Sequence, residues 1–165
     1  MSDEAVERKG VSSRSEFIAT ARGLFTKLDG ASGRDITLVD PDFSPWPLDD
    51  PEVVEALTRW IQLPGRRLRL MGVRFDLIER DQARFAAWRK PFSHAVECMT
   101  PTEVDASDLP AVLLLFETGY LELWDRERWQ ARWTAERRAW VLQRERIDAL
   151  MQRCEPAWPV TMLGL

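Results

Sequence analysis

The sequence has few of the residues on which reactive sites depend. It contains one histidine, three lysines and two cysteines, Cys98 and Cys154. The cysteines stand far apart and form no Cys-x-x-Cys motif, which argues against a disulfide framework and favours reduced thiols. No apolar run approaches membrane-spanning length, and the N-terminus lacks the basic start and apolar stretch of an export signal. These absences predict a cytoplasmic protein without a transmembrane segment.

The composition is that of one ordinary globular domain. The 165 residues are 45% hydrophobic and 30% charged, and 8 tryptophans with 7 phenylalanines supply large apolar groups for a core. The net charge of −4 opposes binding of nucleic acid or anionic lipid over the whole surface, because both need an excess of cations. Residues 1–12 are polar and are predicted to form a flexible tail, and residues 13–165 a single α/β domain.

Helical and strand patterns alternate along the chain. Apolar positions at helical spacing predict helices at residues 13–28, 50–61 and 76–88, and a long C-terminal helix at about Arg126 to Cys154. Short β-branched or alternating runs predict strands at residues 36–39, 68–72, 95–99 and 111–116, and a turn at 117–119 leads into a hairpin strand at 120–124. Residues 156–165 could add an edge strand. This order predicts an α/β fold, a mixed sheet flanked by helices.

Asp40 and Asp42 directly follow the strand at residues 36–39. Ligands of α/β sheets bind outside the carboxyl ends of strands, and two carboxylates there can hold a hard cation such as Mg²⁺. The Asp40-Pro-Asp42 arrangement resembles the first motif of haloacid dehalogenase-like phosphatases, which implies Asp40 as nucleophile and Asp42 as acid/base. That family also needs a later lysine and a further acidic pair, and no lysine here follows a suitable strand. An acidic, proline-stiffened turn before a capped helix is the preferred interpretation.

His94 is the only histidine, the residue type that most often changes charge near neutral pH. Ser93 precedes it. Sequence neighbours on an extended segment point in different directions, however, so adjacency makes no nucleophile and base pair. A surface or hydrogen-bonded histidine is therefore preferred, and His94 stays a candidate binding residue.

The predicted C-terminal helix is rich in arginine and tryptophan. It could bind nucleic acid or anionic lipid by stacking and phosphate contact through its arginines. The candidates are Arg128, Arg132, Arg137, Arg138 and Arg144. Tryptophans at helical spacing more often belong to a core, and Arg144 stands four residues before Asp148 as an ion pair, so a solvated face is preferred and nucleic acid is not the expected partner. Any aromatic surface that the sheet leaves uncovered would suit a dimer interface.

Three segments, DPEVVEALTRW, RRLRLMGV and AVLLLFETGYLELWD, resemble one half of a phospholipase D-like domain in a degenerate bacterial form. In active members of that family a strand carries His-x-Lys, with an Asp five residues after the Lys, and the His is the phosphoryl-accepting nucleophile. Here Pro110 and Val112 stand where the His and Lys would fall, and Glu117 stands at the Asp position. Neither proline nor valine can form a phosphoenzyme or neutralise phosphate, so the resemblance implies the fold without this chemistry.

The leading hypothesis is a noncatalytic cytoplasmic binding protein with a phospholipase D-like fold, no cofactor, and a protein partner or a second copy of itself as ligand. One rival is a Mg²⁺-dependent phosphohydrolase that uses Asp40 and Asp42. The other is a nucleic-acid or anionic-lipid binder that uses the arginine-rich C-terminal helix. The candidate binding residues are Asp40, Asp42, His94, Arg132 and Arg137, and no residue is assigned to catalysis.

Overall fold

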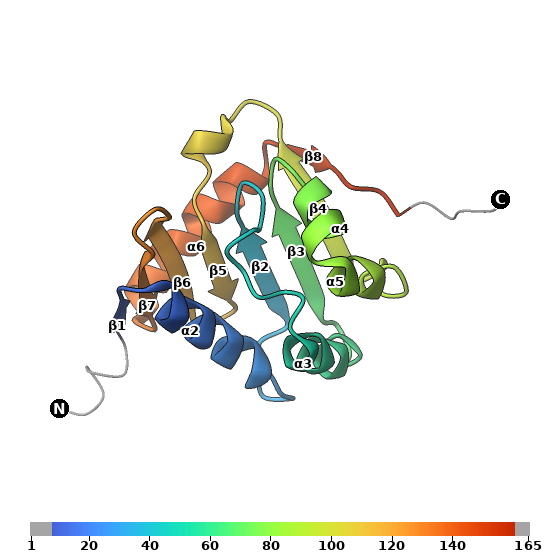
Figure 1. Cartoon of the computed structure of the whole chain (residues 1–165), viewed down its shortest axis with the longest axis horizontal. Coiled ribbons are helices and arrows are strands. Elements are labelled where there is room, and N and C mark those ends of the chain that lie inside the picture. Colours follow the sequence, from blue (N-terminus) through green and yellow to red (C-terminus); the bar gives the residue numbers. More distant parts are fainter. Residues whose placement is uncertain (1–7, 161–165) are drawn as a thin grey trace.

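The computed structural model describes residues 8–160, which form one eight-stranded mixed sheet flanked by helices (Figure 1). The strands are β1 (Arg8–Val11), β2 (Asp35–Val39), β3 (Arg67–Met71), β4 (Val96–Pro101), β5 (Val112–Leu115), β6 (Gly119–Asp125), β7 (Gln130–Thr134) and β8 (Cys154–Pro156). The helices are α2 (Arg14–Thr26), α3 (Pro51–Ile61), α4 (Asp76–Asp81), α5 (Ala83–Trp88) and α6 (Arg137–Met151), with a short 3₁₀ helix η1 (Ala106–Asp108). The predicted α/β class with a mixed sheet is confirmed.

The sheet has a parallel centre and antiparallel flanks. Its order is β1-β7-β6-β5-β2-β3-β4-β8, and β2, β3 and β4 run parallel to one another. The antiparallel strand β5 pairs with β2 and continues through hairpins into β6 and β7. Because β5 is antiparallel to β2, its first residue, Val112, lies beside the last residue of β2, Val39. The end of β2 and the start of β5 therefore meet at one edge of the sheet.

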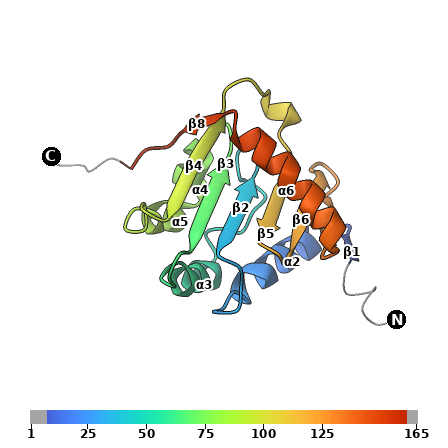
Figure 2. The same ribbon diagram turned by 180° about the vertical axis from the view of Figure 1, so that it is seen from behind.

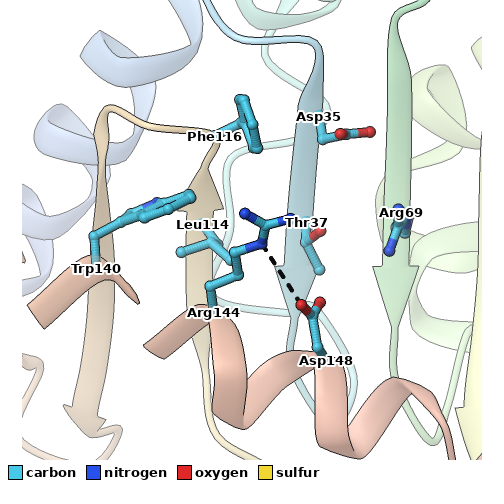
Figure 3. Close-up of a pocket in the computed structure, with 8 residues that line it drawn as sticks. All are labelled: Asp35, Thr37, Arg69, Leu114, Phe116, Trp140, Arg144 and Asp148. Carbon is cyan, nitrogen blue, oxygen red and sulfur yellow. Dashed lines mark ion pairs between the residues drawn. The ribbon is translucent and has the colours of Figure 1, made fainter. Parts of the chain in front are cut away.

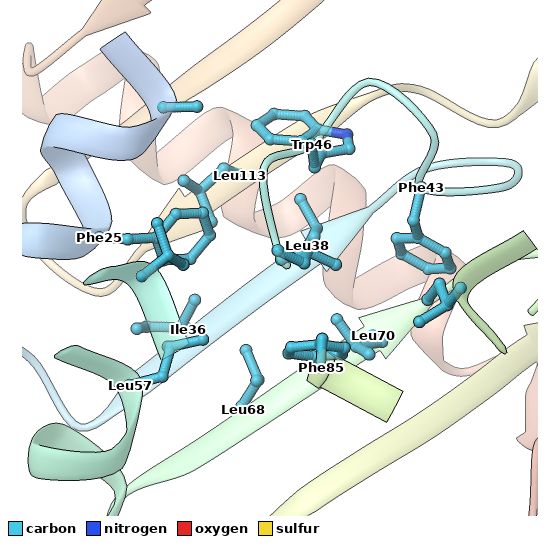
Figure 4. Packing of buried hydrophobic residues seen from close by; sticks show 14 of the residues in the cluster. Phe25, Ile36, Leu38, Phe43, Trp46, Leu57, Leu68, Leu70, Phe85 and Leu113 are labelled. Atoms are coloured by element: carbon cyan, nitrogen blue, oxygen red, sulfur yellow. The ribbon is translucent and has the colours of Figure 1, made fainter. Parts of the chain in front are cut away.

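The two faces of the sheet are covered unequally. Helices α2, α3, α4 and α5 lie on one face, whereas α6 alone crosses the other, as the view from behind shows (Figure 2). The main core fills the space between the sheet and the first group of helices, and Trp46, Phe25, Phe43 and Phe85 are among its fully buried side chains (Figure 4). Within the described part of the chain, no helix is long and apolar enough to cross a membrane.

Local signals placed the first helices correctly. The Ser13 hydroxyl accepts from the backbone N–H of Glu16 at 3.2 Å and caps α2 as predicted. The Glu16 carboxylate accepts from the N–H of Ser12 at 3.3 Å, one residue before the N-cap residue that a capping box would use. The Asp50 carboxylate caps α3, because its Oδ1 accepts from the backbone N–H of Glu52 at 2.9 Å, and Pro51 occupies the first position of the helix. The tight turn at residues 117–119 joins β5 to β6 as predicted.

The helix predicted at residues 76–88 is interrupted at Gln82. This side chain is buried and spans two backbone groups of another loop: its Oε1 accepts from Leu48 N–H at 3.0 Å and its Nε2 donates to Phe43 carbonyl at 3.1 Å. The backbone of Gln82 leaves the helical region at φ −130° and ψ 51°. Tertiary hydrogen bonds thus divide the segment into α4 and α5.

The prediction of one helix from Arg126 to Cys154 is wrong over its first part. Residues 130–134 form β7, and α6 begins only at Arg137. Trp129 turns the chain with φ 54°, and Trp133 then alternates with Arg132 across the strand. Trp129, Trp133 and Trp140 match helical spacing, but the first two lie on a turn and a strand. The helical spacing of these three tryptophans was therefore a coincidence.

The flexible tail predicted at residues 1–12 is wrong for its last part. Arg8 to Val11 form the edge strand β1, which pairs antiparallel with β7. Positions 1–7 lie outside the described residues. At the other end, the edge strand β8 (Cys154–Pro156) pairs with β4, and it overlaps the edge strand predicted at residues 156–165 only at Pro156. Residues 161–165 also lie outside the described range.

Two glycines provide a matched test of this packing. A methyl group added at Gly72 would lie 2.7 Å from the Asp40 carbonyl oxygen and would overlap the Phe43 ring, whereas Gly23 in α2 has nothing within 4 Å. We expect Gly72→Ala to destabilise the protein by about 1 to 3 kcal/mol through overpacking. Gly23→Ala should stabilise it by about 0.5 to 1 kcal/mol, because alanine restricts the unfolded chain and favours the helix. Urea denaturation followed by circular dichroism measures both, and equal effects of the two substitutions would contradict the packing described.

Candidate functional site

Asp40 follows β2 directly, and its carboxylate is fully buried. Its Oδ2 accepts from the backbone N–H groups of Asp42 at 3.0 Å and Phe43 at 2.7 Å. Its Oδ1 accepts from the indole Nε1 of Trp46 at 3.1 Å and from Arg126 Nη1 at 2.5 Å. Both oxygens are therefore engaged by donors of the protein, and the group serves as an anchor for the loop that follows β2.

Asp42 shares the same guanidinium. Its Oδ1 accepts from Arg126 Nη2 at 2.9 Å, from the Ser44 hydroxyl at 2.8 Å and from the Ser44 N–H at 3.0 Å. One arginine thus bridges the acidic pair that the sequence singled out. A cation held by both carboxylates would have to displace this guanidinium.

The two carboxyl groups differ in their titration. Burial raises the pKa of Asp40, since removal from water disfavours the charged form, while Arg126 and the amide donors oppose that rise. Burial also acts to raise the pKa of Asp42, but the hydrogen bonds from Ser44 and the charge of Arg126 outweigh it, so this pKa lies below the usual value. The difference follows from exposure, because Asp42 retains contact with water and Asp40 does not.

Arg126 was not recognised as a site residue from the sequence. It lies in the turn between β6 and β7, where the register shifts between Leu123 and Asp125 and the Asp125 carboxylate accepts from Arg128 N–H at 3.1 Å. The residue pattern predicted a helix over this stretch, on which Arg126 would belong to a solvated basic face. Only the pairing of β5 with β2 brings the turn to Asp40.

A groove of about 520 Å³ opens beside this ion pair. It is lined by residues 107–111 ahead of β5, by residues 122–127 of β6 and its turn, and by Arg146 of α6. Arg146 pairs with Glu122 at 3.4 Å, so both arginines of the groove already have carboxylate partners. Trp124 is 59% exposed and offers the groove an aromatic surface.

The positions matched to the phospholipase D motif lie along β5. Pro110 lines the groove at the start of the strand, Val112 is fully buried in the core, and Glu117 lies exposed in the turn at the other end. The valine side chain packs with Leu114 and Trp140 beneath α6. Pro110 is therefore the one position of the three that faces the groove.

The other candidates lie apart from Asp40 and Asp42. His94 is exposed and precedes β4, so it lies at the amino end of the parallel strands, opposite the end at which Asp40 lies. Arg132 is exposed on β7 and Arg137 is exposed at the start of α6. Within residues 8–160, no group of three or more His, Cys, Asp or Glu side chains is placed to hold a metal ion.

A smaller cavity lies beneath α6, lined by Thr37, Arg69, Trp140 and Arg144 among others (Figure 3). Arg144 pairs with Asp148 at 3.6 Å and lies 5.3 Å from the centre of the Phe116 ring. Arg69 lies 3.9 Å from the Glu97 carboxylate. Both arginines that line this cavity therefore have carboxylate partners within the protein.

The chain resembles known proteins in its fold, but no family membership is shown. No protein-family model and no curated protein matches the sequence. Among solved structures, the archaeal chromatin protein TrmBL2, whose structure shows a novel mode of DNA binding, matches with a TM-score of 0.63 and 15% identity over 92% of this chain and 54% of that one. The chain thus spans about half the length of TrmBL2.

Two further solved structures match over their full length. NucT from Helicobacter pylori has a TM-score of 0.57 with 6% identity over 92% of this chain, and Nuc from Salmonella typhimurium, a phospholipase D family member, has 0.55 with 10% identity over 93%. At these identities the likeness concerns the fold. The chain has a phospholipase D-like α/β fold.

The Arg126 bridge gives a test with a defined pH dependence. Arg126→Met leaves Asp40 buried without its neutralising partner, and we expect a loss of about 2 to 3 kcal/mol in the free energy of unfolding at neutral pH. Without the guanidinium, the folded-state pKa of Asp40 rises further above its unfolded value. In the unfolded chain, Asp40 loses its proton at a lower pH than in the folded protein. The extra loss of stability is therefore smallest in acid, and it grows as the pH rises from the unfolded-state pKa of Asp40 to its folded-state pKa.

Urea unfolding of wild type and variant at pH values from about 4 to 7 measures this difference. Arg128→Met, two residues further along the same turn, removes an exposed charge and serves as the control. A loss in Arg126→Met that is the same at every pH would contradict the assigned role.

Proposed function

We propose that this chain is a noncatalytic phospholipase D-like domain that functions by binding, with a second copy of itself as partner. The observation that carries the first part is the chemistry at the start of β5. Pro110 faces the groove and Val112 is sealed in the core, so neither position matched to the family's motif offers a nucleophile or a cation for phosphate. The free cysteines, Cys98 and Cys154, accord with a cytoplasmic location.

The state of the acidic pair supports the same proposal. General acid, base or nucleophile roles need a group that can reach a substrate. Asp40 has no exposed surface, and Arg126 binds both it and Asp42. The carboxylates hold the loop after β2 in place, and both are already bound by the Arg126 guanidinium before any ligand arrives.

The groove favours a protein over a nucleic acid. Four acidic residues line it, and its two arginines are each paired with a carboxylate. The acidic residues are Asp108, Glu122, Asp125 and Glu127. A polyanion would meet net negative charge here, whereas exposed tryptophan is enriched at protein interfaces. The fold occurs in a DNA-binding chromatin protein and in a phospholipase D family member, so the fold alone does not decide between these functions.

The α6 side of the sheet supplies the surface for a second copy. Parallel strands are usually covered on both faces, but here a single helix crosses this side (Figure 2). Leu142 on α6 is 60% exposed, and Trp124 lies on the same side as Glu122, whose carboxylate contacts α6. Two large apolar side chains are thus left uncovered beside a sheet face that α6 spans only in part.

Charge on this face is self-complementary. Asp35, Arg67 and Glu97 lie on neighbouring strands, and Arg67 lies 3.3 Å from Asp35 and 3.7 Å from Glu97. Arg69 follows on the same face, at 3.9 Å from Glu97. Two acids and two bases alternate across the strands, so a copy related by a twofold axis can set each charge against its opposite.

The catalytic part is tested with a generic phosphodiester. We expect the purified protein to hydrolyse bis(4-nitrophenyl) phosphate no faster than buffer, with and without Mg²⁺, because no reactive group faces the groove. Release of 4-nitrophenolate measures the rate. Turnover that rises with protein concentration and falls by about tenfold or more in Asp42→Asn or His94→Ala would contradict the proposal.

Self-association is tested by sedimentation velocity across protein concentration. We expect a dimer at concentrations of about 10 to 100 μM, weakened by about tenfold or more in Trp124→Gln with Leu142→Gln, since the apolar contact is lost. Val73→Gln removes an exposed apolar side chain from the loop after β3 and should leave association unchanged. A wild-type protein that stays monomeric over this range would exclude the second copy as partner.

A further inference from the structure

Arg89 is a buried cation that forms no salt bridge within the described residues, 8–160. It caps the C-terminal end of α5 and is only 4% exposed. Its Nε is buried and has no hydrogen-bond partner. No carboxylate of residues 8–160 lies within 4.0 Å of its guanidinium. Buried charges in proteins are almost always paired or bound to a ligand, so this isolated charge requires an explanation.

The neighbours of Arg89 do not neutralise it. The Cys98 thiol lies beside the guanidinium, but burial raises the pKa of Cys98 to about 11, so the thiol is uncharged at neutral pH. The Trp158 ring stacks on the guanidinium at 3.4 Å from the ring centre, which is favourable but supplies no net charge. The charge of Glu79 acts to raise the pKa of Arg89, but this carboxylate is exposed, lies beyond salt-bridge distance of the guanidinium and accepts from Trp158 Nε1 at 2.9 Å.

Arg89 lines a groove of about 440 Å³. It is lined by Arg89 and Ser93, by residues 96–99 of β4, and by residues 156–160 of the C-terminal segment. The segment pairs with β4 only at Met99–Pro101, after which one bond from Ala157 N–H to the Cys98 carbonyl is the last link. The groove therefore lies where the chain leaves the edge of the sheet, near β8 and α5 in Figure 1.

The surroundings suit a planar oxyanion. A guanidinium presents parallel N–H donors that match the two oxygens of a carboxylate or phosphate. The Ser93 hydroxyl lines the same groove and can donate a further hydrogen bond. The indole of Trp158 forms an apolar wall that lowers the local dielectric and strengthens such a contact.

We propose that Arg89 binds the oxyanion group of a small carboxylate- or phosphate-bearing ligand in the groove between α5 and residues 156–160. The negative charge of the ligand would form the ion pair with Arg89 that no carboxylate of residues 8–160 forms. This site is distinct from the groove beside Arg126 and does not depend on self-association. Burial lowers the pKa of Arg89, in keeping with an unneutralised charge, and an anion would reverse that effect.

The experiment follows the Nε–Hε signal of Arg89 in ¹⁵N-labelled full-length protein during titration with inorganic phosphate or with acetate in chloride buffer. We expect a saturable shift of this signal with one of the two anions. A shift with phosphate only identifies a phosphate-bearing ligand, and a shift with acetate only identifies a carboxylate-bearing one. An Arg89 signal unmoved by both anions would overturn the proposal, and this readout needs no variant.

Two variants separate the site from general charge effects. Arg89→Met keeps the length of the side chain without its charge and should weaken calorimetric binding of the anion by about tenfold or more. Lys90→Met removes the neighbouring exposed cation and should bind as wild type does. Because an unpaired buried charge is lost, Arg89→Met should unfold at an equal or higher urea concentration than wild type. Equal affinity in Arg89→Met and wild type would refute the site.

Discussion

The ion pair between Asp40 and Arg126 connects the two halves of the sheet. Asp40 ends the first parallel strand, and Arg126 lies in a turn of the antiparallel half, more than eighty positions later. A buried pair of this kind adds little net stability compared with apolar packing, since both ions lose their water. The pair instead fixes the position of the β6–β7 turn, because Arg126 must lie where it can bind both carboxylates. Loss of either partner leaves a buried charge, so the loop after β2, the turn and the groove wall are coupled.

Much of the fold follows from local signals. The Ser13 N-cap and the Asp50-Pro51 start are short-range features, and both were predicted correctly because they use hydrogen bonds within one turn. The apolar run ahead of Phe116 predicts a buried strand because a strand covered on both faces carries apolar residues without alternation. Features decided by distant contacts were missed. Gln82 breaks a helix through bonds to residues 43 and 48, and no local pattern shows this.

The candidate site shows the same difference between features set by local sequence and features set by distant contacts. Asp40 and Asp42 could be identified from the sequence because a carboxylate pair after a strand is a local pattern, but this pattern does not distinguish an exposed pair from a buried one. Burial depends on Trp46 and Arg126, which the fold brings to the pair. Arg89 carried no signal, because an arginine near a helix end is ordinarily a solvated residue. Its significance arises from Trp158 and Cys98, which come from the C-terminal segment and β4.

The N-terminal strand has a consequence for synthesis. Val11 pairs with Ala131, about 120 residues later in the chain. As the ribosome releases the chain from its N-terminus, the parallel centre can assemble while Arg8–Val11 still has no strand to join. Closure of this edge is therefore one of the last steps, after β7 emerges. From the time β7 joins the sheet until β1 pairs with it, the outer edge of β7 and the strand β1 both present unpaired backbone groups, so this stage is the one most exposed to strand exchange between nascent chains.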